Sequence, residues 1–152
     1  MGSHHRLSVT LLVVPISLAS WACNSSSTSI GPTPLRTGIE GTWSGTASDA
    51  SGPGHMVWRL SQSGSTFSGT ASLLEDTTLL VGHGTISGTV EAGLVSFILT
   101  IPAGGFDLPY QRCLVQLTGT ARLTATRLIG DFAGSNSCSG PVTGGQFTLE
   151  QP

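Results

Sequence analysis

The stretch GTWSGTAS at residues 41–48 decides the fold class, because it alternates strictly between two kinds of side chain. Gly, Trp and Ala occupy every second position, and Thr or Ser fills each position between them. A period of two places successive side chains on opposite faces of a β-strand, one facing a core and one facing water. The same alternation returns at residues 66–73 and 84–90, and no stretch after residue 38 has the period of an amphipathic helix.

Short Gly-rich segments separate these alternating stretches, which is typical of antiparallel hairpins between consecutive strands. The pattern predicts an all-β domain. We expect an antiparallel eight-stranded up-and-down meander, which either closes into a barrel or stays open or flattened. The expected strands are residues 40–48, 54–62, 65–74, 79–90, 94–101, 111–123, 127–135 and 145–151.

The placement of the turns predicts the register of three hairpins. The opposed inward residues are Leu60/Phe67, Trp58/Gly69 and Met56/Ala71; Val90/Val95, Gly88/Phe97 and Ile86/Leu99; and Leu123/Leu128, Ala121/Gly130 and Gly119/Phe132. Each hairpin then sets an inward aromatic ring opposite a glycine, which offsets the poor strand propensity of glycine. The inward glycines either let the strands coil sharply or leave room for a ligand inside the barrel.

The chain has three cysteines, and the register of the third hairpin brings two of them together. Cys113 lies directly opposite Cys138, where Cα atoms are about 4.5–5.5 Å apart and a disulfide can form. The sequence therefore predicts this bond, which an exported protein permits, and it leaves Cys23 for another role.

Residues 1–22 have the pattern of an export signal, with Arg6 before an apolar run from Leu7 to Ala19. The run has the length of the apolar part of a signal peptide and is short for a membrane span. An expression tag at Met1–His5 is an alternative for the first residues. Residues 24–38 are polar, contain two prolines and have no apolar period, which is typical of a flexible tether. The expected domains are a signal segment 1–22, a tether 23–38 and a barrel 39–152.

Ser20-Trp21-Ala22-Cys23 resembles the lipobox of bacterial lipoproteins. The resemblance implies cleavage before Cys23, acylation of its thiol and export to the cell envelope, where the lipid attaches the protein to a membrane. Two or three acyl chains anchor a protein stably. By analogy with the family, Asn24 favours the outer over the inner membrane. Ser20 and Trp21 depart from the usual motif, so ordinary signal cleavage that leaves a free Cys23 is the alternative.

Glu40-Gly41-Thr42-Trp43, at the head of an eight-strand meander, resembles the first strand of the calycin barrels, the lipocalins and avidins. The resemblance implies that Trp43 closes one end of the barrel. Only three residues carry the motif, and the arginine that follows the last lipocalin strand is missing. No binding residue of that family is therefore carried over.

Charge and motifs exclude several classes of function. The net charge of −2 and the lack of lysine offer no basic surface for nucleic acid. The sequence has no nucleophile elbow or dinucleotide motif, and His55 and His83 are too few for a metal site. Glu75 and Asp76 are expected to be solvated turn residues. The sequence thus predicts a protein that is not an enzyme and that uses no cofactor or metal.

Two functions remain. In the first, the barrel binds a small apolar ligand, and the loop 102–110, with Phe106, Asp107 and Tyr110, is either a lip of its mouth or only a long connection. The inward residues expected to line the ligand site are Trp43, Met56, Trp58, Phe67, Ile86, Phe97 and Phe132. In the second, the core is filled and the protein presents its Ser/Thr surface to an envelope partner or a glycan. An interior cavity above roughly 300 Å³ would favour the first function.

Overall fold

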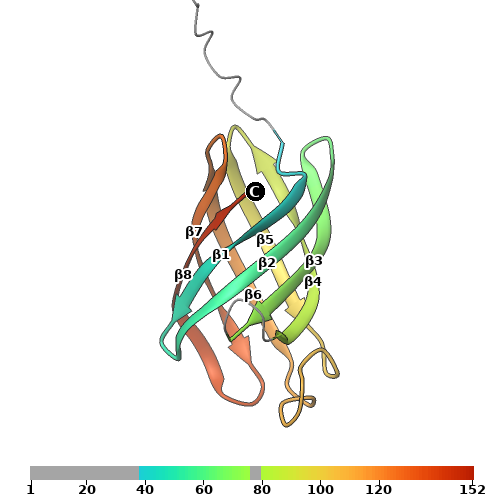
Figure 1. Cartoon of the computed structure of the whole chain (residues 1–152), viewed down its shortest axis with the longest axis vertical. Coiled ribbons are helices and arrows are strands. Elements are labelled where there is room, and N and C mark those ends of the chain that lie inside the picture. The colour runs from blue at the N-terminus through green and yellow to red at the C-terminus, as the bar shows by residue number, and fades with distance from the viewer. Residues whose placement is uncertain (1–37, 76–79) are drawn as a thin grey trace, which may run out of the picture. The chain divides into compact units, whose positions relative to one another are not determined.

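The computed structural model describes residues 38–75 and 80–152, which form a closed β-barrel (Figure 1). The predicted signal segment 1–22, the proposed lipid acceptor Cys23 and residues 24–37 of the predicted tether lie outside the described residues. Within the described ranges there is no helix of the length and hydropathy needed to cross a membrane.

Eight antiparallel strands follow one another around the barrel in chain order, and β1 pairs with β8 to close it. The strands are β1 (Gly41–Asp49), β2 (Gly52–Ser63), β3 (Thr66–Leu74), β4 (Leu80–Glu91), β5 (Leu94–Ile101), β6 (Val115–Leu123), β7 (Arg127–Asn136) and β8 (Gly140–Glu150). The predicted up-and-down meander is confirmed, and of the closed, open and flattened forms the closed one is observed. The alternating burial along the strands follows the period of two in the sequence.

Two strands begin four or five residues away from their predicted first residues, whereas the other starts differ by at most two residues. β6 begins at Val115 rather than at residue 111, because the preceding residues form a turn in which the Cys113 amide donates to the Tyr110 carbonyl at 2.9 Å. β8 begins at Gly140 rather than at residue 145. Its first residues pair with β7 across a register shift between Phe132 and Gly134.

The predicted registers of the β4–β5 and β6–β7 hairpins are confirmed, including the pairs Gly88/Phe97 and Gly119/Phe132. The β4–β5 turn shows why the first of these could be predicted. Ala92 and Gly93 both have positive φ angles, of 48° and 80°. Two such residues form the two-residue turn whose twist matches that of the flanking strands.

The predicted register of the β2–β3 hairpin is wrong by two residues. Trp58 pairs with Ala71, and Gly69 pairs with Leu60. The turn residues are Gly64 and Ser65 rather than Ser63 and Gly64, and Gly64 has a φ of 60°. Glycine at the first of two central positions gives the other favoured hairpin turn, type II′. A shift of two residues keeps every side chain on its predicted face, so the inward set is unchanged.

Three phenylalanine rings each lie over a glycine of the following strand. A Cβ atom added to that glycine would lie 2.8 Å from Phe67 Cζ at Gly88, 2.5 Å from Phe97 Cζ at Gly119 and 2.6 Å from Phe132 Cζ at Gly145. The expectation that Trp58 covers Gly69 is therefore wrong, because the register differs. The expected covers of Gly119 by Phe132 and of Gly88 by Phe97 are also wrong, since each ring leans toward the following strand instead, Phe132 over Gly145 and Phe97 over Gly119. The space beside each of these glycines is therefore filled by a phenylalanine ring and is not open for a ligand.

Candidate functional site

The two ends of the barrel differ in how they are closed. At one end the described chain begins at Gly38, and tight turns connect β2 to β3 and β4 to β5. Trp43 is fully buried near this end, and its Nε1 donates a hydrogen bond to the Ile39 carbonyl at 2.8 Å. We call this the closed end. The long β5–β6 connection, residues 102–114, lies at the other end (Figure 1), which we call the mouth.

A layer of aromatic rings divides the interior between these ends. Trp58 on β2 contacts Phe97 on β5 and Phe147 on β8, with ring centroids 5.0 Å and 5.1 Å apart. Phe97 and Phe147 contact each other at 5.7 Å. Since β2 and β5 lie on different sides of the barrel, these rings cross its interior. They fill the middle of the barrel between its two ends.

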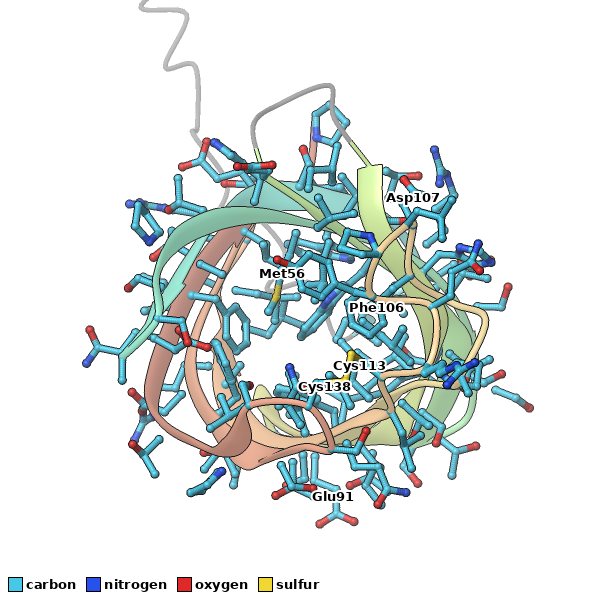
Figure 2. All side chains as sticks on the ribbon, turned by 90° about the horizontal axis from the view of Figure 1, so that it is seen from below. Met56, Glu91, Phe106, Asp107, Cys113 and Cys138 are labelled. Atoms are coloured by element: carbon cyan, nitrogen blue, oxygen red, sulfur yellow. A yellow bond between two sulfur atoms is a disulfide. The ribbon has the colours of Figure 1, made fainter. Side chains whose placement is uncertain are left out.

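The mouth contains a cavity of about 540 Å³. Its apolar lining residues include Ala47, Met56, Leu73, Phe106, Val115, Leu117, Phe132 and Val142. Figure 2 looks into this end and shows Met56 and Phe106 inside the ring of strands, with the disulfide at the opening. The volume lies within the range of about 300–1,000 Å³ that is typical of small-molecule sites.

The seven residues predicted to line a ligand site are all buried, but they lie at different depths. Met56 and Phe132 line the mouth cavity. Trp43, Trp58, Phe67, Ile86 and Phe97 pack within the core and are not among the residues that line it. The sequence analysis did not single out Leu73, Val115, Leu117 or Val142. The inward positions of Leu73, Val115 and Leu117 follow from the period of two, whereas Val142 precedes the strand predicted for residues 145–151. The period does not indicate which end of a strand is open.

The β5–β6 loop borders the mouth on one side. Phe106 and Tyr110 line the cavity, and Phe106 forms an isolated β-bridge with Gly82 of β4. The Phe106 ring fits there because Gly82 has no side chain: an added Cβ would lie 2.6 Å from Phe106 Cε1. Asp107 points away from the opening (Figure 2), and its amide donates to the Val81 carbonyl at 3.2 Å. The loop thus places two aromatic side chains at the edge of the cavity.

The predicted disulfide between Cys113 and Cys138 is confirmed, with Cα atoms 5.4 Å apart. It joins the end of the β5–β6 loop to the β7–β8 turn, and both cysteines line the cavity. The bond therefore connects two sides of the mouth covalently.

The charged side chains among the described lining residues are Asp49 and Glu75, accompanied by the titratable His55. Glu75 is exposed, as predicted for a turn residue, whereas Asp49 is half-buried. Among the described residues, no three His, Cys, Asp or Glu side chains are grouped so that they could hold a metal ion. The mouth therefore offers an apolar interior with an acidic edge.

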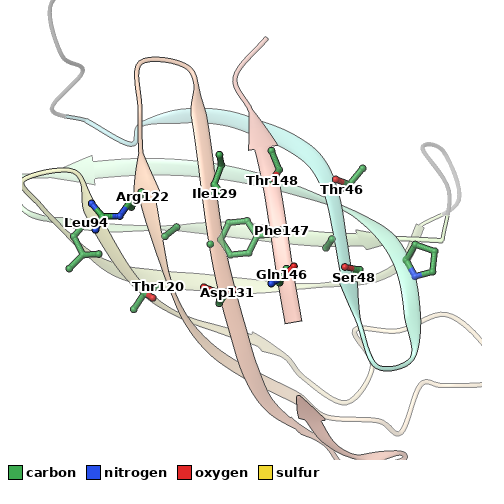
Figure 3. Close-up of a pocket in the computed structure, with 14 residues that line it drawn as sticks. Thr46, Ser48, Leu94, Thr120, Arg122, Ile129, Asp131, Gln146, Phe147 and Thr148 are labelled. Atoms are coloured by element: carbon green, nitrogen blue, oxygen red, sulfur yellow. The ribbon is translucent and has the colours of Figure 1, made fainter. Parts of the chain in front are cut away.

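A second hollow, of about 620 Å³, lies on the outer wall over β1 and β5 to β8 (Figure 3). Half of its lining residues are outward-facing polar residues: Thr46, Ser48, Thr120, Arg122, Asp131, Gln146 and Thr148. Leu94 and Ile129, 52% and 48% exposed, supply apolar surface. Because this hollow lies on the polar face of the strands, it is less suited than the mouth to bury an apolar molecule.

Comparison of the sequence with known protein families gives no match, and no curated protein matches it either. The functional inference is therefore drawn from the residues and geometry of the barrel.

Proposed function

We propose that the protein is a non-enzymatic lipoprotein of the cell envelope whose barrel binds a small apolar ligand. The observation that supports this most strongly is the apolar cavity of about 540 Å³ at the mouth. The aromatic rings of Trp58, Phe97 and Phe147 pack against one another in the middle of the barrel. We expect a ligand to enter from the loop end and to lie against Met56 and Phe132, which line the cavity.

The scale of the interaction follows from the apolar surface that a ligand would bury. A buried methylene group contributes about 0.8 kcal/mol, so a ten-carbon chain contributes at most about 8 kcal/mol. That free energy corresponds to a dissociation constant of about 1 µM at best. We therefore expect simple alkyl ligands to bind with dissociation constants of about 1 µM or higher.

The calycin resemblance supports the same proposal. That resemblance implies that the tryptophan of the first strand closes one end of the barrel. Trp43 lies near the closed end here, opposite the mouth, and its hydrogen bond to Ile39 ties it to the residues that precede β1.

Filling the mouth with a larger side chain should weaken the binding of an apolar probe. Val142 faces the cavity from β8 and is half-buried. We expect Val142→Trp to weaken binding of N-phenyl-1-naphthylamine, followed by its fluorescence, by at least about tenfold, because the indole would occupy space that the probe needs.

The matched control is Thr143→Trp, which adds the same ring at the next, exposed residue. This variant should bind the probe like the parent, and thermal melts of both variants establish that they are folded. Equal binding by folded Val142→Trp and the parent would place the probe outside the mouth.

We further propose that Cys23 carries the lipid, with outer-membrane attachment favoured over inner. The leader before Cys23 and the polar tether after it support this. The described chain begins at Gly38, at the closed end of the barrel and opposite the mouth.

Replacement of the lipid acceptor tests the anchor separately from the cavity. A Cys23→Ser chain produced in a bacterial cell should move from the membrane fraction to the soluble fraction, because the acylated thiol is lost. Fractionation followed by immunoblotting measures this, with Cys113→Ala and Cys138→Ala together as the control for cysteine loss as such. Retention of Cys23→Ser in the membrane would rule out the proposed anchor.

A structural or interaction protein of the envelope is the second candidate. The outer hollow favours it, since exposed Leu94 and Ile129 flank Arg122 along paired strands. Under this alternative the parent would bind no apolar probe in the mouth.

A further inference from the structure

We propose that the ligand of the mouth cavity is a cationic amphiphile, an apolar chain that carries a protonated amine. This inference rests on the proposed function and adds the chemistry of the ligand's head group. It follows from three properties of the mouth: the sign of its charged groups, their lack of basic partners, and the aromatic side chains that line the same cavity.

The charged groups of the described lining are both carboxylates. Asp49 is the last residue of β1, and its Oδ1 accepts a hydrogen bond from the Ser51 amide at 2.7 Å. Glu75 follows the last residue of β3. Both strands end at the mouth, so the carboxylates lie where the head group of a ligand would emerge while its chain occupies the apolar interior.

Neither carboxylate is neutralised by a basic side chain. Within the described ranges, the only ion pair joins Arg127 to Glu150, at 3.1 Å, near the closed end. Arg112 belongs to the loop at the mouth, but it is exposed and is not among the residues that line the cavity. The lining therefore presents uncompensated negative charge.

Charge of one sign beside low-dielectric walls attracts ions of the opposite sign and repels those of the same sign. A carboxylate or sulfate head group is thus disfavoured in this mouth, and an ammonium group is favoured. Phe106 and Tyr110 line the same cavity from the β5–β6 loop. Aromatic faces also attract ammonium groups, which adds to the preference when the cation lies over a ring.

A set of ligands that differ only in charge tests the proposal. Decylammonium, 1-decanol and decanoate are titrated into the full chain at pH 8 and low ionic strength, below the concentration at which each forms micelles. We expect decylammonium to bind about tenfold more tightly than decanoate, with 1-decanol between them, since each exposed charge pair changes affinity by up to about fivefold. The difference should shrink in 0.5 M salt, because salt screens exposed charges.

Two substitutions test whether Asp49 and Glu75 cause the preference for the cationic ligand. Asp49→Asn combined with Glu75→Gln should remove most of the difference between decylammonium and decanoate while the affinity for 1-decanol stays unchanged. Asparagine keeps the oxygen that accepts the Ser51 amide, so the turn is preserved. Glu91→Gln is the control, because it removes a carboxylate at the β4–β5 turn of the closed end, away from the cavity.

The outcomes separate this inference from the proposed function. If 1-decanol binds but the three ligands bind equally, or decanoate binds most tightly, the cationic preference is wrong and the apolar site stands. A preference that survives in the double variant would also overturn the assignment to Asp49 and Glu75. If none of the three ligands binds, both the proposed function and this inference fall.

Discussion

Replacing Cys113 and Cys138 together with alanine should lower the free energy of unfolding by about 3.5 kcal/mol. The two cysteines are 25 residues apart, and their bond closes a loop of that length. In the chain-entropy account, the disulfide restricts the unfolded chain, and a loop of this size corresponds to about 3.5 kcal/mol. Alanine suits the comparison because Cys113 is buried and a polar replacement would add a separate cost.

Urea denaturation of the full chain measures this change. The parent in the presence of a thiol reductant is the control and should match the double variant, since both lack the bond. A loss below about 1 kcal/mol would contradict the account, because it would mean that the bond hardly restricts the unfolded chain.

Gly69→Val should destabilise the barrel by about 3 kcal/mol, the upper part of the usual range for overpacking. A Cβ at residue 69 would overlap the Arg59 carbonyl oxygen and lie 3.0 Å from Leu60 Cα. These are backbone atoms of β2, which pairs with β1 on one side and β3 on the other. The backbone cannot move away without breaking one of these pairings. The cost therefore arises from the neighbouring strand and not from the Trp58 ring.

Strand propensity predicts the opposite result, since valine forms strands better than glycine does. Ser68→Val is the matched control, because Ser68 is the adjacent, exposed residue of β3. This control should melt at or slightly above the temperature of the parent. A Gly69→Val protein that melts as high as the Ser68→Val protein would show that β2 and β3 are not closely apposed at this glycine.

The faces of the strands could be predicted from the sequence, because each face depends only on the local period of two. All seven residues that were predicted to line a ligand site, and therefore to point inward, are buried. The register of β6–β7 could also be predicted, and with it the pairing of Cys113 with Cys138. The β2–β3 register could not be predicted, because Gly64 suits either central position of a two-residue turn and each choice gives a different pairing.

The start of β8 and the position of the cavity depend on contacts that are distant in sequence. Gly140, Pro141, Gly144 and Gly145 resemble a loop by composition, yet residues 140–142 pair with β7 beyond its register shift. The period of two shows which face of a strand a residue occupies, but it does not show how far along the barrel axis that residue lies. The mouth is defined by how the β5–β6 loop returns over Gly82, which brings Phe106 to the cavity, and a local pattern does not contain that contact.

The central claim is that the mouth, and not the closed end or the outer wall, receives an apolar ligand. Methyl NMR of the full chain during titration with 1-decanol tests it most directly. We expect shifts at Met56, Leu73 and Val142, which line the cavity, and none at Val95, Leu128 or Leu149, which are buried outside its lining. Shifts confined to Leu94 and Ile129 on the outer wall, or no saturable shifts at all, would contradict the claim.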